Sequence, residues 1–157
     1  MADLVLVRNI GAYITTRRGS GAGTGAQTAG ATATITGATI DREGFAGGSL
    51  PDSMQTAFLY DSTLASGKTL VVYFDVQHST NNSTFTDFAT GTGTTTVTGA
   101  SGGSVQQGSI SFNVNLHGAY RYIRTLVVPS LSATGTDTIT GLIVDVVAGY
   151  DRLAAPA

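Results

Sequence analysis

Residues 67–88 read GKTLVVYFDVQHSTNNSTFTDF, and this stretch decides the fold class. Alternate positions from Leu70 to Val76 are all apolar, whereas the positions between them are mixed. This two-residue period predicts a strand with one buried face. Five small polar residues at 79–83 then predict a turn rather than a helix. The alternation resumes at 84–88, so we expect a β-hairpin whose second strand adds Phe85 to the buried layer.

Strand-like patterns recur on both sides of this hairpin, at 32–40, 110–116, 120–128 and 138–148. A short Thr-rich strand is also expected within 90–103, and Phe45 is expected to be a core anchor. Residues 54–60 fit either a helical turn or a strand, and their all-β surroundings favour a strand. We expect Pro129 to end the 120–128 strand. About eight short strands joined by turns predict an all-β protein with one β-sandwich or jelly-roll-like domain.

The N-terminal part of the chain has a different character. Residues 19–31 read GSGAGTGAQTAGA and have no side chains able to build a core. Residues 1–18 can then be a tethered arm, an exposed edge of the domain or a disordered terminus. We therefore divide the chain into an extended Gly-rich N-terminal arm or loop at 1–31 and a β-sandwich domain at 32–157.

The composition excludes several classes of protein. Charged residues make up 11% of the chain, against about 25% in ordinary domains, and there are 25 Thr, 21 Gly and one Lys. Such a surface suggests partial coverage by neighbouring molecules, because charge normally keeps a free monomer soluble. A net charge of −2 argues against nucleic acid as a partner. Without cysteine there is no disulfide or thiolate chemistry. No apolar run is long enough to span a membrane, and residues 1–11 do not resemble a signal peptide.

Three motifs superficially resemble catalytic or cofactor sites. GASGG at 99–103 matches a nucleophile elbow, but no helix is expected after it. Gly-rich matches at 67–69 and 21–26 lack the strand and helix that a phosphate or dinucleotide site needs. His78 and His117 have no accompanying metal-ligand pattern, and a chance Asp75–His78–Ser79 triple is common in a Ser/Thr-rich chain. We expect no enzymatic activity, no cofactor and no metal.

Arginine and tyrosine cluster at 120–124, which reads YRYIR. Arg121 and Arg124 occupy positions of opposite parity in a strand, so they should not form one patch. Ion pairing within the chain or across an interface is the expected role of each. Arg17 and Arg18, beside the Gly-rich tract, can similarly anchor an arm on an acidic neighbour.

Three segments together carry a resemblance to a known family. They are IDREGF at 40–45, DVQHSTNNSTFTD at 75–87 and GAYRYIR at 118–124, followed by Pro156 near the C-terminus. From about residue 34 onward the chain resembles small head proteins of tailed bacteriophages, in which an I-D-x-x-G-F turn, a hairpin ending in S-T-F-T and a G-x-x-R-Y-x-R strand recur. It departs from them at Thr80-Asn81-Asn82, which replaces an acidic-glycine turn, in its longer 19–30 tract, and in its C-terminus, which lacks Gly-His-Pro.

The resemblance implies a capsid decoration, or cement, protein with a β-sandwich body. Such a protein binds the major capsid protein on the outer surface of the virion and stabilises the shell without catalysis. It implies a homotrimer at local three-fold positions, with a dimer as the alternative. The residues expected at a capsid or subunit interface are Arg8, Tyr13, Arg17, Arg18, Arg121 and Arg124.

Two other functions stay open from the sequence. A β-sandwich binding module of a phage tail or adhesin would recognise a receptor or carbohydrate, and it would need an exposed aromatic platform, for which Tyr13, Tyr60 and Tyr150 are candidates. A small hydrolase would rest on Ser101 within the GASGG match.

Overall fold

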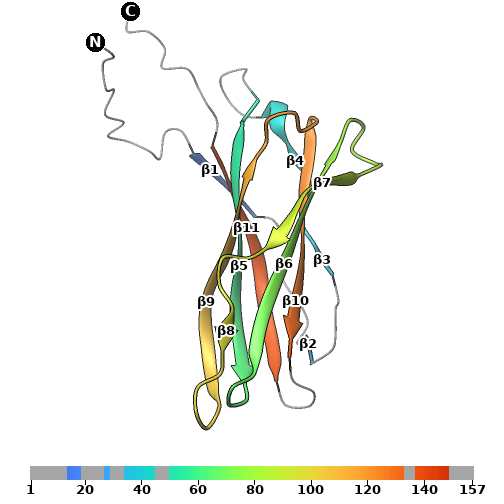
Figure 1. Cartoon of the computed structure of the whole chain (residues 1–157). Helices are drawn as coiled ribbons and strands as arrows, with labels where there is room; N and C mark the ends of the chain where they lie inside the picture. Colours follow the sequence, from blue (N-terminus) through green and yellow to red (C-terminus); the bar gives the residue numbers. More distant parts are fainter. Residues whose placement is uncertain (1–13, 19–26, 29–33, 45–49, 133–136, 149–157) are drawn as a thin grey trace, which may run out of the picture.

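The computed structural model describes residues 14–18, 27–28, 34–44, 50–132 and 137–148. Figure 1 shows two β-sheets packed face to face, and all strand pairs are antiparallel. Sheet A has the order β1-β11-β5-β9, with β2 also pairing with β11. Its strands are β1 (Ile14–Arg18), β2 (Gln27–Thr28), β5 (Ser53–Leu64), β9 (Ser104–Asn115) and β11 (Thr138–Ala148). The predicted all-β sandwich is confirmed.

Sheet B has the order β3-β10-β6-β7, with β4 on β10 and β8 on β6. Its strands are β3 (Ile35–Thr36), β4 (Ile40–Asp41), β6 (Thr69–Ser79), β7 (Thr86–Thr92), β8 (Val97–Thr98) and β10 (Tyr122–Leu131). A 3-10 turn, η2 (Arg42–Gly44), follows β4. No helix in the described ranges is long and apolar enough to cross a membrane.

The core lies between the two sheets. Leu70, Val72, Phe74 and Val76 of β6 are all buried, as their alternation predicts. They face the buried side chains of sheet A, among them Phe58, Leu64, Ile110, Ile139 and Ile143. Fully burying one such side chain contributes about 1.5–3 kcal/mol, so this layer holds the sheets together.

The hairpin at 67–88 forms, but its second strand has a different phase from the predicted one. β6 and β7 pair with a register shift between Val76 and Gln77. Because a bulge inserts one extra residue into a strand, it changes which residues face inward. Phe88 and Ala89 therefore pack against the core. The prediction that Phe85 joins the buried layer is wrong, because Phe85 precedes β7 and its half-buried ring lies 4.0 Å from the Arg124 guanidinium carbon.

Other boundaries differ from the sequence-based expectation. The strand favoured at 54–60 is confirmed, and β5 is longer than this prediction, because it runs from Ser53 to Leu64. The strand expected at 32–40 is two short pieces, β3 and β4, both paired with β10. Phe45 lies outside the described residues.

Pro129 does not end β10, which continues to Leu131. Proline is tolerated in a strand where its missing N–H would point away from a paired neighbour. In the described ranges Pro129 pairs only with Val72 of β6, and β3 pairs with β10 at Leu126 and Val127 instead. The prediction that Pro129 ends the strand was wrong, because the sequence does not show on which side of β10 the missing N–H of Pro129 would point.

The chain between β7 and β8, two strands of sheet B, also contacts the edge of sheet A and closes one side of the sandwich. Gly93 N–H donates to Val72 C=O at 2.8 Å, and Thr94 N–H donates to Ser111 C=O at 3.0 Å. A Cβ on Gly93 would overlap Ile110, so this close crossing requires glycine.

At the N-terminus, β1 lies inside the segment assigned to the arm. It pairs with β11 over five residues, from Ile14 opposite Ala148 to Arg18 opposite Val144. β11 is thereby central in sheet A, as its apolar sequence predicts. The domain division at residue 31 stays a prediction.

Candidate functional site

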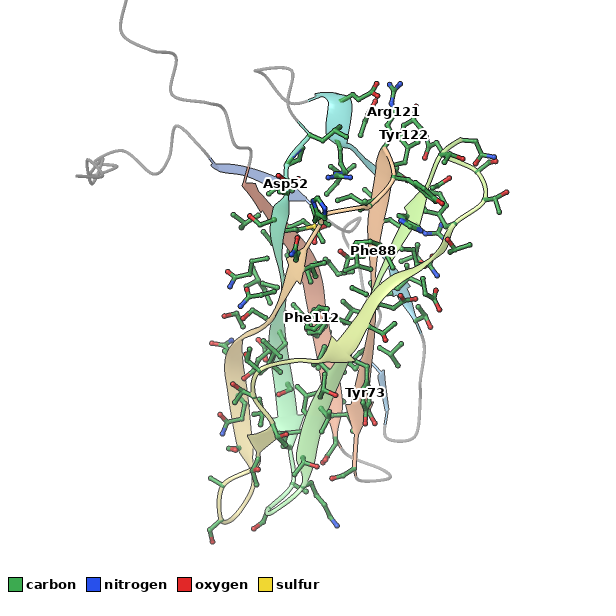
Figure 2. All side chains as sticks on the ribbon, turned by 45° about the horizontal axis from the view of Figure 1, so that its top comes forward. Asp52, Tyr73, Phe88, Phe112, Arg121 and Tyr122 are labelled. Atoms are coloured by element: carbon green, nitrogen blue, oxygen red, sulfur yellow. The ribbon has the colours of Figure 1, made fainter. Side chains whose placement is uncertain are left out.

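The fold brings the three segments that carry the family resemblance together at one end of the sandwich. We call this region, residues 40–44, 75–88 and 118–124, the motif end. Tyr122 of β10 pairs with Asp41 of β4 on one side and with Ser79 of β6 on the other. Figure 2 shows Arg121 and Tyr122 together at this end of the molecule. Residues far apart in the sequence thus form one continuous surface.

Arg121 is held by acidic side chains of the same chain. Its Nε and Nη2 donate to the two carboxylate oxygens of Asp41 at 3.0 and 2.8 Å, and its Nη1 lies 2.7 Å from Glu43 Oε2. The guanidinium also lies over the Tyr122 ring, 4.9 Å from its centroid. The hydrogen bond from Arg121 lowers the pKa of Asp41, so the carboxylate is ionised at neutral pH.

Arg42 is buried at the same end, and the described residues place no carboxylate within hydrogen-bond range of it. Its side chain donates to four backbone carbonyls: Nη1 to Ala119 and Tyr120, and Nη2 to Pro51 at 2.6 Å and Leu116 at 3.2 Å. Its residue is 2% exposed, and burial lowers the pKa of its guanidinium. These bonds join η2 to the β9–β10 connection, so Arg42 fixes the backbone of the motif end.

His78 forms an aromatic contact rather than a metal site. Its Nδ1 accepts the Tyr120 N–H at 3.3 Å, and its ring stacks on the Tyr120 ring with centroids 4.1 Å apart. Phe88 contacts it from 5.0 Å. Burial, with a smaller contribution from Arg42, lowers the pKa of His78, so its ring is neutral at pH 7. Among the described residues no three His, Asp or Glu side chains are grouped closely enough to hold a metal ion.

A second polar network runs along the outer face of sheet B. Arg124 donates from Nε and Nη2 to Gln77 Oε1 at 2.9 and 2.7 Å. Gln77 Nε2 in turn donates to Asp87 at 2.8 Å and to Asp75 at 3.2 Å. Burial, together with the charge of Asp87, raises the pKa of Asp75 to about 6. Arg121 and Arg124 therefore have separate partners and do not form one basic patch.

The outer face that β5, β9 and β11 give to sheet A is very different, because charged side chains are almost absent from the described residues there. On β5, β9 and β11 the described outward side chains are Ser, Thr, Asn, Gln, Ala, Leu or Val, with Asp61 the one charged residue among them, because Asp145 of β11 is buried in the core. Leu59 is 40% exposed at the middle of the sheet and Val105 is 65% exposed at its edge. A shallow groove lined by Gln55, Asn113 and Val146, among others, hollows the face near the motif end. We call this surface the uncharged face.

The residues predicted for an interface are scattered over the structure. Arg8 and Tyr13 lie outside the described residues. Arg17 and Arg18 lie in β1, opposite Asp145 and Val144 of β11. Arg121 and Arg124 lie at the motif end, where their hydrogen bonds are to residues of the same chain.

The structure also shows the surroundings of Ser101 and of some of the tyrosines on which the two alternative functions depend. Ser101 lies in an exposed turn before β9, with no helix after it, so the nucleophile-elbow geometry is absent there. Tyr60 is half-buried, and Tyr150 lies outside the described residues. Tyr73 and Tyr120 are about half exposed, but Tyr120 already stacks on His78.

Sequence reasoning missed Arg42 and the uncharged face. Arg42 has no periodic pattern around it, and its four acceptors are main-chain carbonyls that the sequence does not mark. The uncharged face was visible only as a low overall charge content. A signal did exist in β9, whose outward positions contain no ionisable residue.

No protein-family model matches the chain, and no curated protein matches it. Solved structures do match over most of its length. They include a structure of the Gx strain of infectious bursal disease virus, with 13% identity, a TM-score of 0.47, and coverage of 88% of this chain and 34% of that one. A mutant VP2 protein of the same virus, from T=1 particles, has 14% identity, a TM-score of 0.47, and coverage of 90% and 33%. The exported protein XepA of PBSX has 15% identity, a TM-score of 0.41, and coverage of 91% and 39%. This chain spans roughly a third of the length of each of these chains, and similarity at this level does not identify a family.

Proposed function

We propose that this chain is a structural protein of a tailed-phage virion that binds the outer surface of the capsid and stabilises it. The uncharged face is the observation that carries the proposal. A sheet of this size normally keeps charges on its solvent side, because they maintain solubility. A face of amide, hydroxyl and aliphatic groups can instead be buried against another protein without removing ions from water, which is costly.

The role of each part follows from its chemistry. The motif end is held by Arg42 and by the Arg121 ion pairs, so it is a rigid support for neighbouring loops. The uncharged face supplies a flat contact for the major capsid protein. Many copies on one rigid lattice reinforce one another through effective concentration, so each contact can be modest. This mechanism needs no catalytic residue.

The experiment is a binding assay with emptied phage heads, imaged by electron cryomicroscopy. The variant Leu59→Lys places a charge in the middle of the uncharged face, and Tyr73→Lys places one on the outer face of sheet B as a matched control. Leu59 is 40% exposed and Tyr73 48% exposed, and both lie on outer faces, so both variants should fold. We expect regular extra density with the unaltered chain and with the control, and reduced occupancy with Leu59→Lys.

Equal occupancy for the two variants would show that the uncharged face does not bind the shell. Bare heads with the unaltered chain would contradict the proposed function. A specific hit on a glycan array, together with bare heads, would favour the receptor-binding alternative.

A further inference from the structure

The edge of sheet A formed by β9 is open. β9 pairs with β5 over twelve successive residues, from Ser104 opposite Leu64 to Asn115 opposite Ser53, without a register shift. Its sequence, SVQQGSISFNVN, contains no charged residue and no proline. Natural edge strands are normally protected by lysine, proline, a bulge or a covering segment, because an open edge pairs with other strands. The N-terminal half of β9 has none of these devices.

The hydrogen bonds show which main-chain groups are directed outward. Ser111 C=O accepts from Thr94, which lies beyond the edge, whereas Gln106 C=O accepts from Ser62 of β5. Since direction alternates along a strand, the odd-numbered residues of β9 point their N–H and C=O groups away from β5. Val105, Gln107 and Ser109 are the exposed odd positions before Ser111. Within the described ranges, no other strand pairs with them.

An edge strand of the other sheet, β7, has the protective features that β9 lacks. β7 of sheet B is shorter, carries Asp87 and pairs with β6 through a bulge. These are protective features, and β7 therefore makes a poor template for a further strand.

We propose that the open edge of β9 binds the same edge of a second copy of this chain, antiparallel, around a two-fold axis at Gln107. In this register Gln107 lies opposite Gln107 of the second copy, and Val105 lies opposite its Ser109. Each such pair exchanges two N–H···O bonds, so the three pairs would form about six. The register is bounded at one end by Ser111, whose C=O is already occupied.

The side chains agree with this self-pairing. A two-fold axis places identical residues near one another, so a charged edge would repel itself, whereas this edge carries no charge. The Gln107 Nε2 donates to Asp61 Oδ2 at 2.7 Å, and the amide keeps its second N–H and its Oε1 for a bond to Gln107 of the second copy.

The resulting dimer has a continuous sheet across both copies, and the two uncharged faces become one surface. It is the dimer that the sequence left as the alternative to a trimer. This inference does not rest on the proposed function, since the edge pairs with or without a capsid.

Single-cysteine cross-linking tests the register directly, because the chain has no cysteine of its own. Gln107→Cys places two thiols on directly opposite residues, about 5.5 Å apart at Cα, which is within disulfide range. Asn113→Cys is the matched control on the same strand and face, and its copy would lie about 40 Å away. Under mild oxidation most Gln107→Cys chains should become covalent dimers, while Asn113→Cys should stay uncross-linked. Equal cross-linking of the two, or none at residue 107, would overturn the proposal.

A second variant tests the association without a cross-link. Ser109→Pro removes an outward N–H, and proline is tolerated at such a position in an edge strand. Sedimentation equilibrium should give the mass of two chains for the unaltered protein and of one chain for Ser109→Pro. A one-chain or three-chain mass for the unaltered protein would contradict the two-fold pairing, and the cysteine pair gives a separate answer if the proline variant does not fold.

Discussion

Arg121 donates two hydrogen bonds to the Asp41 carboxylate, from Nε and Nη2, although the two residues lie 80 positions apart in the chain. The contact joins β4 to the start of β10 and holds two of the three segments at the motif end. A bidentate pair of this kind depends on the planar guanidinium, which an ammonium group cannot reproduce.

Replacing Arg121 by Lys should raise the pKa of Asp41 toward its ordinary value. The hydrogen bond from Arg121 is the largest cause of the lowered pKa, and lysine can bond only one carboxylate oxygen well. A lowered pKa stabilises the fold at neutral pH, and this contribution is lost as the pH falls below about 4. Titration of the carboxyl carbon by NMR measures the shift, and an unchanged Asp41 pKa in Arg121→Lys would show that the ion pair does not form in solution.

Arg42→Met should destabilise the protein by about 3 kcal/mol or more. The change leaves buried carbonyls without donors, and a hydrogen bond to a charged group contributes about 1.5–3 kcal/mol. Urea unfolding followed by circular dichroism measures the loss. Arg124→Met is the control, because Arg124 is only half-buried and bonds a side chain. Equal losses for the two variants would contradict the special role assigned to Arg42.

Asp145→Asn should stabilise the protein at pH 7 and not at pH 3. Asp145 is fully buried between the sheets, where Thr125 Oγ1 donates to its Oδ1 at 3.0 Å and its Oδ2 has no partner in the described ranges. Burial raises the pKa of Asp145, against the opposing effect of Thr56 and Thr125. The folded-state pKa of such a carboxyl lies above its unfolded-state pKa of about 4. Its contribution to stability is therefore fully present below pH 4 and is lost as the pH rises through the folded-state pKa.

Unfolding free energies at the two pH values decide this prediction. If Asp145→Asn instead destabilises the protein at pH 7, Asp145 is ionised and paired.

Asp87→Asn should lower the pKa of Asp75 below its value of about 6. Asp87 is the second cause of that value after burial, so part of the shift should remain. Removing the neighbouring negative charge makes ionisation of Asp75 easier. NMR titration of Asp75 checks the change, with the exposed Asp61→Asn as control. A pKa that stays near 6 in Asp87→Asn would mean that burial alone sets it.

Much of the fold could be predicted from alternation alone. The core side chains of β6 and β9 follow a simple two-residue period, because each strand has one face against the opposite sheet. The failures arose where pairing overrides residue preference. The bulge in β7 places Phe88 rather than Phe85 against the core. Pro129 continues β10, and the described residues pair with it only on the β6 side.

The candidate site was predictable only in part. The three resemblance segments were visible in the sequence, but their meeting at one end depends on β10 lying between β4 and β6. Arg42 was not foreseeable, because its partners are main-chain carbonyls from two places in the chain, Pro51 and the β9–β10 connection. The uncharged face required the register of β5, β9 and β11, which assigns each residue to one side of the sheet.

Occupancy of emptied phage heads by the purified chain, measured by electron cryomicroscopy, tests the central claim most directly. The account predicts extra density at regular lattice positions on the outside of the shell, weakened by Leu59→Lys and unaffected by Tyr73→Lys. Heads that remain bare at saturating concentrations of the unaltered, folded chain would contradict it.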